Sequence, residues 1–213
     1  MPTAPLFLLR AGVLLAIAAL AGCSLPLPDK PVRAEPYDLG LALPLADNTH
    51  AASGVPLALA DVQAPAAIDT RHMVYRLLYV GDAQQPRPYA QARWTMPPAQ
   101  LVTQRLRDAL SAQHPVVAAS SALAAIDIQA RLDEFSQLFS SPSESTGVVR
   151  LRVTAFTAPS AAGGSQLLGQ HLFMASRPAP TPDANGGAQA LRLATDDVVR
   201  QAVDWIDTLR PNP

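Results

Sequence analysis

The sequence has one cysteine, almost no net charge and no recognisable catalytic motif, and each of these shortages excludes a class of protein. With a single cysteine among 213 residues, the chain has no internal disulfide. Basic and acidic residues number 16 and 17, and this balance argues against a nucleic-acid partner, which calls for a basic patch. We therefore expect neither a disulfide-stabilised fold nor a nucleic-acid-binding protein.

Motifs that carry catalytic chemistry are also missing. There is no GxSxG nucleophile elbow, no HExxH zinc motif and no Walker phosphate-binding loop. The histidines are scattered, and we expect structural roles for His72 and His171 on predicted strands. The neighbouring acids Asp133 and Glu134 are expected on opposite faces of a strand, because side chains alternate there. The sequence therefore predicts no catalytic residue, no metal site, no cofactor and no ATP hydrolysis.

The N-terminus has the composition of an export signal. Arg10 precedes an apolar run from Ala11 to Ala21, and small residues follow at the end of the run. The apolar stretch that starts at Leu6 is interrupted by Arg10 and is too short for a spanning helix of about 20 residues. The sequence predicts a signal peptide over residues 1–22.

The stretch Leu20-Ala21-Gly22-Cys23 resembles the lipobox of bacterial lipoproteins. The resemblance implies that diacylglycerol is attached to the Cys23 thiol, that the chain is cut before Cys23, and that acyl chains such as palmitate anchor it. Two or more acyl chains give stable anchoring without a membrane span. Ser24, in place of Asp, resembles the signal for the inner leaflet of the outer membrane, facing the periplasm. The alternative is an ordinary secretory signal that happens to contain a cysteine.

The segment that follows the cysteine is rich in proline. Residues 24–36 contain four prolines, and such segments form extended spacers that would span roughly 40 Å here. We interpret residues 23–36 as the lipidated cysteine with a tether, and residues 37–210 as one domain. The alternative for the tether is a disordered tail.

The rest of the chain combines strands with two helices. Alternation of apolar and polar residues, clear over 125–135 and 148–157 and less clean over 166–176, predicts a half-buried antiparallel meander of three long strands. Shorter strands are expected over 37–41, 55–62, 72–80, 89–94 and 116–119. Apolar stripes predict two helices. The first is capped by Thr95 and ends near Gln113, and the second covers 188–209 and is started by Asn185-Gly186-Gly187. Asp196 and Arg200 are spaced as a helical ion pair.

A series of short motifs resembles one family. These motifs are Tyr37-Asp38-Leu39, Tyr75-Arg76, Tyr89, Arg93-Trp94 and Pro97-Pro98. Their order is similar to that of the ABC-type transport auxiliary lipoproteins, which include the paraquat-inducible lipoprotein and partners of mammalian cell entry (MCE) lipid transporters. The resemblance implies an α/β fold of the α+β type, with a mixed, largely antiparallel sheet of about five or six strands and two helices packed on one face. It also implies a periplasmic accessory component without catalysis, whose ATPase and permease are separate chains.

The hairpin of residues 72–94 carries the residues that we predict to bind a partner: Tyr75, Arg76, Arg93 and Trp94. Arginine beside aromatic residues is the composition of interface hot spots. Alternation places Arg76 in an apolar row, where it needs a partner acid or an interface, and places Arg93 on the face of Tyr89. The expected partner is the MCE-domain protein and its ABC transporter, or another copy of this chain. The alternative that Trp94 is simply a residue of the hydrophobic core stays open.

Two further interpretations remain open at this point. For Arg150 and Arg152 a solvated sheet face is favoured over binding of lipid phosphates. For the whole chain, the alternative function is an outer-membrane lipoprotein that regulates an envelope assembly or a cell-wall enzyme. A secreted hydrolase is disfavoured by the missing nucleophile motif.

The lipid anchor gives the first testable prediction. Cys23→Ser removes the thiol that would carry diacylglycerol, so the variant should take up no label from a fatty-acid analogue and should stay uncleaved or leave the membrane. Metabolic labelling beside the unaltered chain measures this directly. Label retained at the unaltered level on the Cys23→Ser protein would refute the assignment.

Overall fold

The computed structural model describes residues 33–41, 54–81, 83–119, 121–158 and 164–209. The predicted signal peptide, Cys23 and most of the predicted tether lie outside these residues. A compact unit begins at Ala34 and includes all of the helices and strands described below. Within the described ranges, no helix has both the length and the apolar character needed to cross a bilayer.

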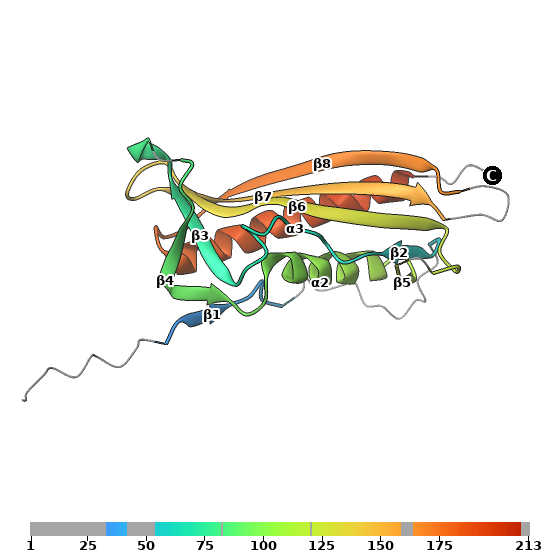
Figure 1. Ribbon diagram of the computed structural model, residues 1–213, viewed down its shortest axis with the longest axis horizontal. Coiled ribbons are helices and arrows are strands. Elements are labelled where there is room, and N and C mark those ends of the chain that lie inside the picture. The colour runs from blue at the N-terminus through green and yellow to red at the C-terminus, as the bar shows by residue number, and fades with distance from the viewer. Residues whose placement is uncertain (1–32, 42–53, 82, 120, 159–163, 210–213) are drawn as a thin grey trace, which may run out of the picture. The chain divides into compact units, whose positions relative to one another are not determined.

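The predicted fold class is confirmed: a mixed sheet carries two helices (Figure 1). The strands are β1 (Glu35–Tyr37), β2 (Leu57–Leu59), β3 (His72–Leu77), β4 (Arg87–Trp94), β5 (Val116–Ala118), β6 (Ile126–Phe139), β7 (Ser145–Thr157) and β8 (Leu167–Pro178). The helices are η1 (Leu78–Val80), a 3₁₀ turn, and the α-helices α2 (Pro98–Ser111) and α3 (Ala184–Thr208). The described residues form eight strands, as many as the sequence pattern predicts and more than the five or six that the resemblance implies; three of them have only three residues each.

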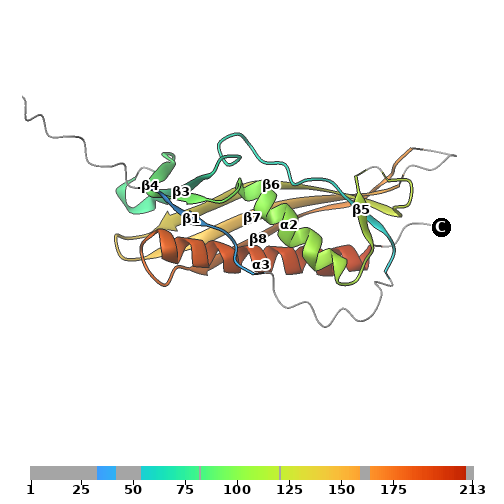
Figure 2. The same ribbon diagram turned by 90° about the horizontal axis from the view of Figure 1, so that it is seen from below.

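The long strands β6, β7 and β8 form the predicted antiparallel meander. Leu132, Leu151 and Phe173 stand side by side on its inner face, and polar side chains alternate with the inward-facing residues along β6 and β7. Both helices lie on this inner face, and the outer face is left uncovered by helices (Figures 1 and 2). The alternation in the sequence therefore fixes which face of the sheet receives the helices.

The other edge of β6 binds two strands, one at each end. β2 pairs in parallel with the start of β6, and β3 pairs in parallel with its last residues, Gln137–Phe139. β5 continues the sheet beyond β2, whereas β4 and then β1 continue it beyond β3. The β3–β4 hairpin is thereby attached to one end of the meander.

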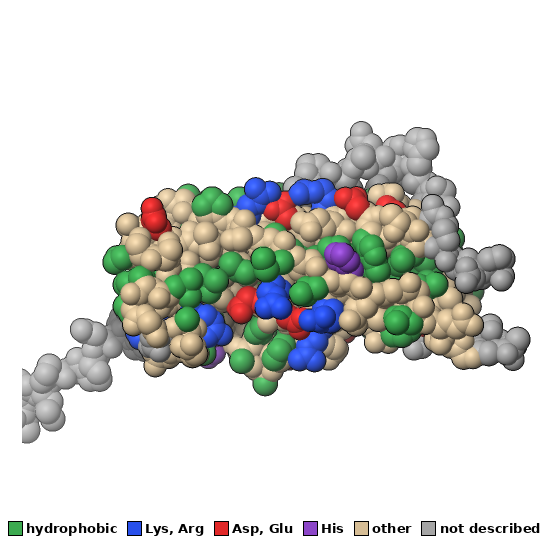
Figure 3. All heavy atoms as spheres, turned by 90° about the horizontal axis from the view of Figure 1, so that it is seen from above, with side chains coloured by type: hydrophobic (Ala, Val, Ile, Leu, Met, Phe, Trp, Pro, Cys, Tyr) green, Lys and Arg blue, Asp and Glu red, His purple; other side chains and the backbone are tan. Residues whose placement is uncertain are grey.

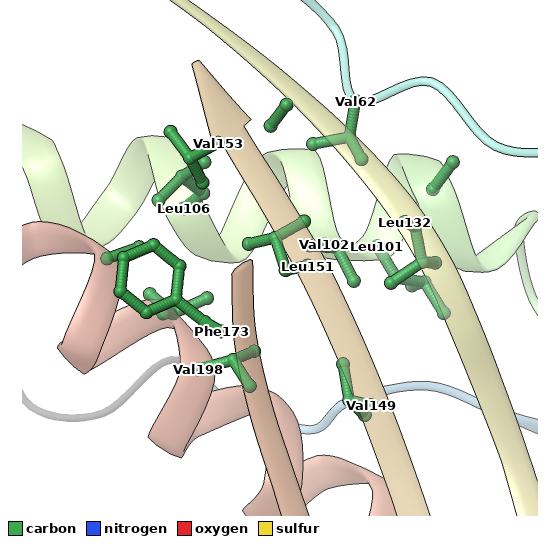
Figure 4. Close-up of a cluster of buried hydrophobic side chains, with 14 of the residues drawn as sticks. Val62, Leu101, Val102, Leu106, Leu132, Val149, Leu151, Val153, Phe173 and Val198 are labelled. Carbon is green, nitrogen blue, oxygen red and sulfur yellow. The ribbon is translucent and has the colours of Figure 1, made fainter. Parts of the chain in front are cut away.

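The core lies between the meander and the two helices (Figure 4). Side chains from all of these elements meet there, including Val62, Leu101, Val102, Leu106, Val149, Leu151, Val153 and Val198. The predicted stripes of α2 and α3 are buried, apart from the half-buried Ala109 on α2 and the half-buried Leu209, which directly follows α3. Burial of such side chains contributes about 1.5–3 kcal/mol for each large one, so packing on the sheet is what stabilises both helices.

The helix starts differ from the predicted ones. Pro97 occupies the N-cap position of α2 without a side-chain hydrogen bond, so the predicted cap by Thr95 is wrong. Asp183 caps α3: its carboxylate accepts a hydrogen bond from the Gly186 N–H at 2.8 Å, and such hydrogen bonds lower the pKa of Asp183. Gly186 therefore lies in the first turn, and the helix begins at Ala184, earlier than predicted.

The ion pairs of α3 also differ from the predicted one. Arg200 pairs with Asp197, three residues before it, and not with Asp196. Asp196 instead points into the protein and pairs with Arg192 at 3.2 Å and with Arg105 of α2 at 3.4 Å. Asp196 does not pair with Arg200 because the Asp196 side chain is buried between the helices, whereas Arg200 is exposed.

The packing of α3 gives the second prediction. Val198 is fully buried, so Val198→Asp places a carboxylate without a partner in the core and should lower the free energy of unfolding by about 3–5 kcal/mol. Gln201→Asp adds the same charge at an exposed position of the same helix and should cost less than about 1 kcal/mol. Urea unfolding measures both. Equal midpoints for the two variants would contradict the docking of α3.

Candidate docking surface on the β3–β4 hairpin

The hairpin predicted from the sequence is present, but its first arm is shorter than expected. β3 ends at Leu77, and residues 78–80 form the turn η1 rather than continuing the strand. Gly81 then adopts a positive φ of 73°, a backbone conformation that favours glycine, and reverses the chain. The strand predicted over 72–80 is therefore too long at its C-terminal end, and Tyr79 lies in the turn.

The inner side of the hairpin is held to the meander by aromatic packing and one hydrogen-bonded chain. The Tyr75 ring lies 4.7 Å from that of Tyr89 and 5.7 Å from that of Phe139. The Tyr89 hydroxyl donates to Gln137 Oε1 at 2.8 Å, and Gln137 in turn donates to Ser145 Oγ at 2.8 Å. Burial raises the pKa of Tyr89 far above its usual range, so its hydroxyl stays a donor. Tyr75 thus belongs to a rigid base rather than to an open surface.

Trp94 lies in the core. Its side chain is 1% exposed, and its ring meets that of Phe135 edge-on at 5.3 Å. The structure therefore supports the alternative that the sequence left open for Trp94, a role in packing.

Arg76 is bound to its own hairpin. Its Nη1 donates to the backbone carbonyls of Ala83 and Gln84 at 3.1 and 3.2 Å. The partner that the sequence required for this arginine is thus the loop of the hairpin, and not an acid. Arg76 fixes the shape of the loop, because a charged donor binds two carbonyls that would otherwise need water.

Arg93 has a different environment. It is exposed, it lies opposite His72 of β3 and Pro36 of β1, and no side-chain partner is found for it within the described ranges. The predicted sharing of a face with Tyr89 is wrong: Tyr89 packs against the core, whereas Arg93 is exposed, because the register shifts along β4. Of the four predicted residues, Arg93 is the one whose side chain is exposed.

A hollow of about 200 Å³ lies between the hairpin and the part of β6 that precedes their paired residues. His72 and Arg76 line one side, and Asp133 and Glu134 line the other. These two acids were expected on opposite faces, but a bulge between Leu132 and Glu134 brings both to the hollow. The Asp133 carboxylate is neutralised by Arg131 at 3.2 Å and by Arg152 at 2.9 Å. The hollow is therefore a depression in which the charge of Asp133 is balanced by neighbouring arginines.

The uncovered face of the meander mixes basic, acidic and apolar side chains (Figure 3). Arg152 is held there by Asp133, as expected for a solvated sheet face. Arg150 lies opposite Glu134 and Met174, and its buried Nε has no hydrogen-bond partner in the part of the chain that the structure describes. Alternation brings the exposed apolar Met174 next to these charges.

Two of the described histidines, His114 and His171, have side-chain contacts within the domain. His171 packs against Phe173 at 4.5 Å and near Trp205 at 6.1 Å, and His114 contacts Asp207 at 2.7 Å. No group of three histidine, cysteine or acidic side chains that could hold a metal occurs within the described ranges.

Two polar residues that organise this region were missed by sequence reasoning. Gln137 is fully buried, and Gly187 of α3 approaches it so closely that an added Cβ would lie 2.1 Å from Gln137 Oε1. Arg105 lies four residues after Leu101 on the apolar stripe of α2, and a charge on such a stripe is a signal that could have identified it. For Gln137 the only signal was the alternation itself, which the bulge in β6 shifts by one residue.

Comparison with known proteins identifies similar chains. A family model described as "ABC-type transport auxiliary lipoprotein component" matches residues 37–203. The crystal structure of XCC0632 from Xanthomonas campestris, described as DUF330, is similar with a TM-score of 0.66 and 16% identity, covering 81% of this chain and 94% of that one. The hypothetical protein CT253 from Chlamydia trachomatis gives a TM-score of 0.50 and 10% identity, covering 73% and 96%. No curated protein matches the sequence.

The two arginines of the hairpin should differ in their effect on stability. Arg76→Ala removes two hydrogen bonds to the loop and should lower the free energy of unfolding by about 1 kcal/mol. Arg93→Ala should change it by less than about 0.5 kcal/mol, because Arg93 is exposed. Urea unfolding of the two single variants decides this. An Arg93 variant as unstable as the Arg76 variant would make Arg93 a structural residue.

Proposed function

This chain belongs to the ABC-type transport auxiliary lipoprotein family, and we propose that it is the lipid-anchored accessory subunit of an MCE-type lipid transporter. The observation that carries the proposal is the family match over residues 37–203, nearly the whole of the domain. The role of the family is auxiliary and implies no catalysis, which agrees with the charge-balanced hollow beside the hairpin. The ATPase and the permease would be separate chains.

The anchor in this proposal is Cys23. Its acyl chains hold the protein in a membrane, and Ser24 directs it to the inner leaflet of the outer membrane, with the domain facing the periplasm. The proline-rich segment links this anchor to the domain.

The docking surface in this proposal is the outer side of the β3–β4 hairpin, with Arg93 as its contact to the MCE-domain protein. Two features support this choice. The inner side of the hairpin is fixed by Tyr89 and Gln137, so little conformational freedom is lost when the outer side binds. Arg93 is exposed and can form a bidentate ion pair with a carboxylate of the partner, the geometry in which arginine binds best.

Charge reversal at Arg93 tests the proposal. Arg93→Glu should weaken capture of the MCE-domain protein at least about tenfold, because truncation of an arginine hot spot already costs about 2 kcal/mol or more. The measurement is a quantitative pull-down with purified MCE-domain protein from the same bacterium.

The matched control is Arg107→Glu. Arg107 is a half-exposed arginine on α2, and its contact with Asp61 is long, at 3.8 Å. This variant should capture the partner normally. If both reversals weaken capture equally, the effect is one of net charge; if neither does, the docking surface lies away from the hairpin.

A further inference from the structure

The tip of the hairpin presents three consecutive apolar side chains to solvent. Leu78, Tyr79 and Val80 are 43%, 44% and 51% exposed, and together they form the turn η1. No residue of this turn is buried. Isolated exposed apolar residues are common on proteins, but a contiguous group at a projecting tip marks a contact site.

The tip is built to project rather than to fold back. β3 is fixed below it by the Tyr75 stack, and Arg76 binds the carbonyls of the returning loop. Gly81 reverses the chain directly after Val80, so the apolar turn sits at the extreme of the hairpin. These fixed contacts therefore hold three apolar side chains outward.

The same end of the domain receives the chain that comes from Cys23. β1 runs parallel to β4 and pairs with its last three residues, Ala92–Trp94, so β1 also points away from the tip. Figures 1 and 2 show η1, the β6–β7 turn and the start of β1 at one end, and β5 at the other. The eleven residues from Cys23 to Arg33 reach at most about 40 Å, at roughly 3.3–3.6 Å per residue.

We propose that the tip formed by Leu78, Tyr79 and Val80 rests in the lipid surface that holds the anchor. The inference rests on the proposed lipid anchor at Cys23 and deepens it, since it assigns a second membrane contact. The tip suits the boundary between headgroups and acyl chains: Leu78 and Val80 are apolar, and the Tyr79 ring is apolar with a polar hydroxyl. Two contacts at one end, the acyl chains and the tip, would orient the domain on the bilayer.

Fluorescence quenching by lipid tests the contact. The full chain with Tyr79→Cys is produced in a bacterial envelope, where Cys23 is lipidated, so that the new thiol is the one available for an environment-sensitive dye. The labelled protein is reconstituted into vesicles of phosphatidylethanolamine and phosphatidylglycerol that contain acyl-brominated lipid. We expect quenching at least about threefold greater than at a control position, since an interfacial segment lies about 5–10 Å deep at the acyl boundary.

Leu123→Cys is the matched control. Leu123 is 76% exposed and lies just before β6, whereas the hairpin is attached at the opposite end of that strand. Both variants must keep the near-ultraviolet circular dichroism of the buried Trp94, which shows that they are folded. Equal quenching at the two positions would overturn the inference, as would a dye at position 79 that is shielded only when the MCE-domain protein is added.

A second preparation separates this inference from the anchor. The chain from residue 23, with Cys23→Ser and an N-terminal hexahistidine, is attached to vesicles that contain a nickel-chelating lipid. If the natural chain does not float with vesicles, the lipid anchor fails. The nickel-attached protein still decides about the tip, because its attachment does not depend on acylation.

Discussion

The buried ion pair between Arg105 and Asp196 joins three parts of the domain: α2, α3 and the chain that follows β1. Arg105 lies on α2 and Asp196 on α3, and the guanidinium also donates to the backbone carbonyls of Leu39, Gly40 and Leu41, which follow β1. Burial raises the pKa of Asp196, and the nearby Arg105 and Arg192 oppose that rise. Loss of one partner of such a pair typically costs about 3–5 kcal/mol, because a charge is left buried alone. The pair thus fixes both the angle between the helices and the path of the chain after β1.

The position of β1 has consequences for function. β1 pairs with the last residues of β4, so the contacts of Arg105 indirectly close the edge of the hairpin that carries Arg93. They also determine the end of the domain at which the chain from Cys23 enters. A single interaction in the interior therefore relates the proposed anchor, the proposed docking surface and the apolar tip to one another.

The sequence was sufficient where one physical rule acts alone. Strict alternation predicted β7 and most of β6, and the apolar stripe predicted α3, because burial of one face outweighs every local preference in these elements. It was insufficient where tertiary contacts override local preference. The bulge before Glu134 changes which side chains share a face, and no local signal announces it. The pairing of Asp196 with Arg105 instead of Arg200 depends on a helix that lies far away in the chain.

In the candidate site, too, the sequence predicted some features and missed those that depend on tertiary contacts. Arginines beside aromatic residues identified the hairpin correctly as a distinctive unit, but residue type alone could not separate structural roles from exposed ones. Trp94 and Tyr75 pack on the core side, Arg76 binds the loop, and Arg93 is exposed. Contact between this exposed side and the transporter is the central claim. Site-specific photo-crosslinking in intact cells tests it most directly, with a photoreactive residue at position 93 or at position 107. We predict a crosslink to the MCE-domain protein from position 93 and none from position 107; a crosslink from position 107 alone would contradict the claim.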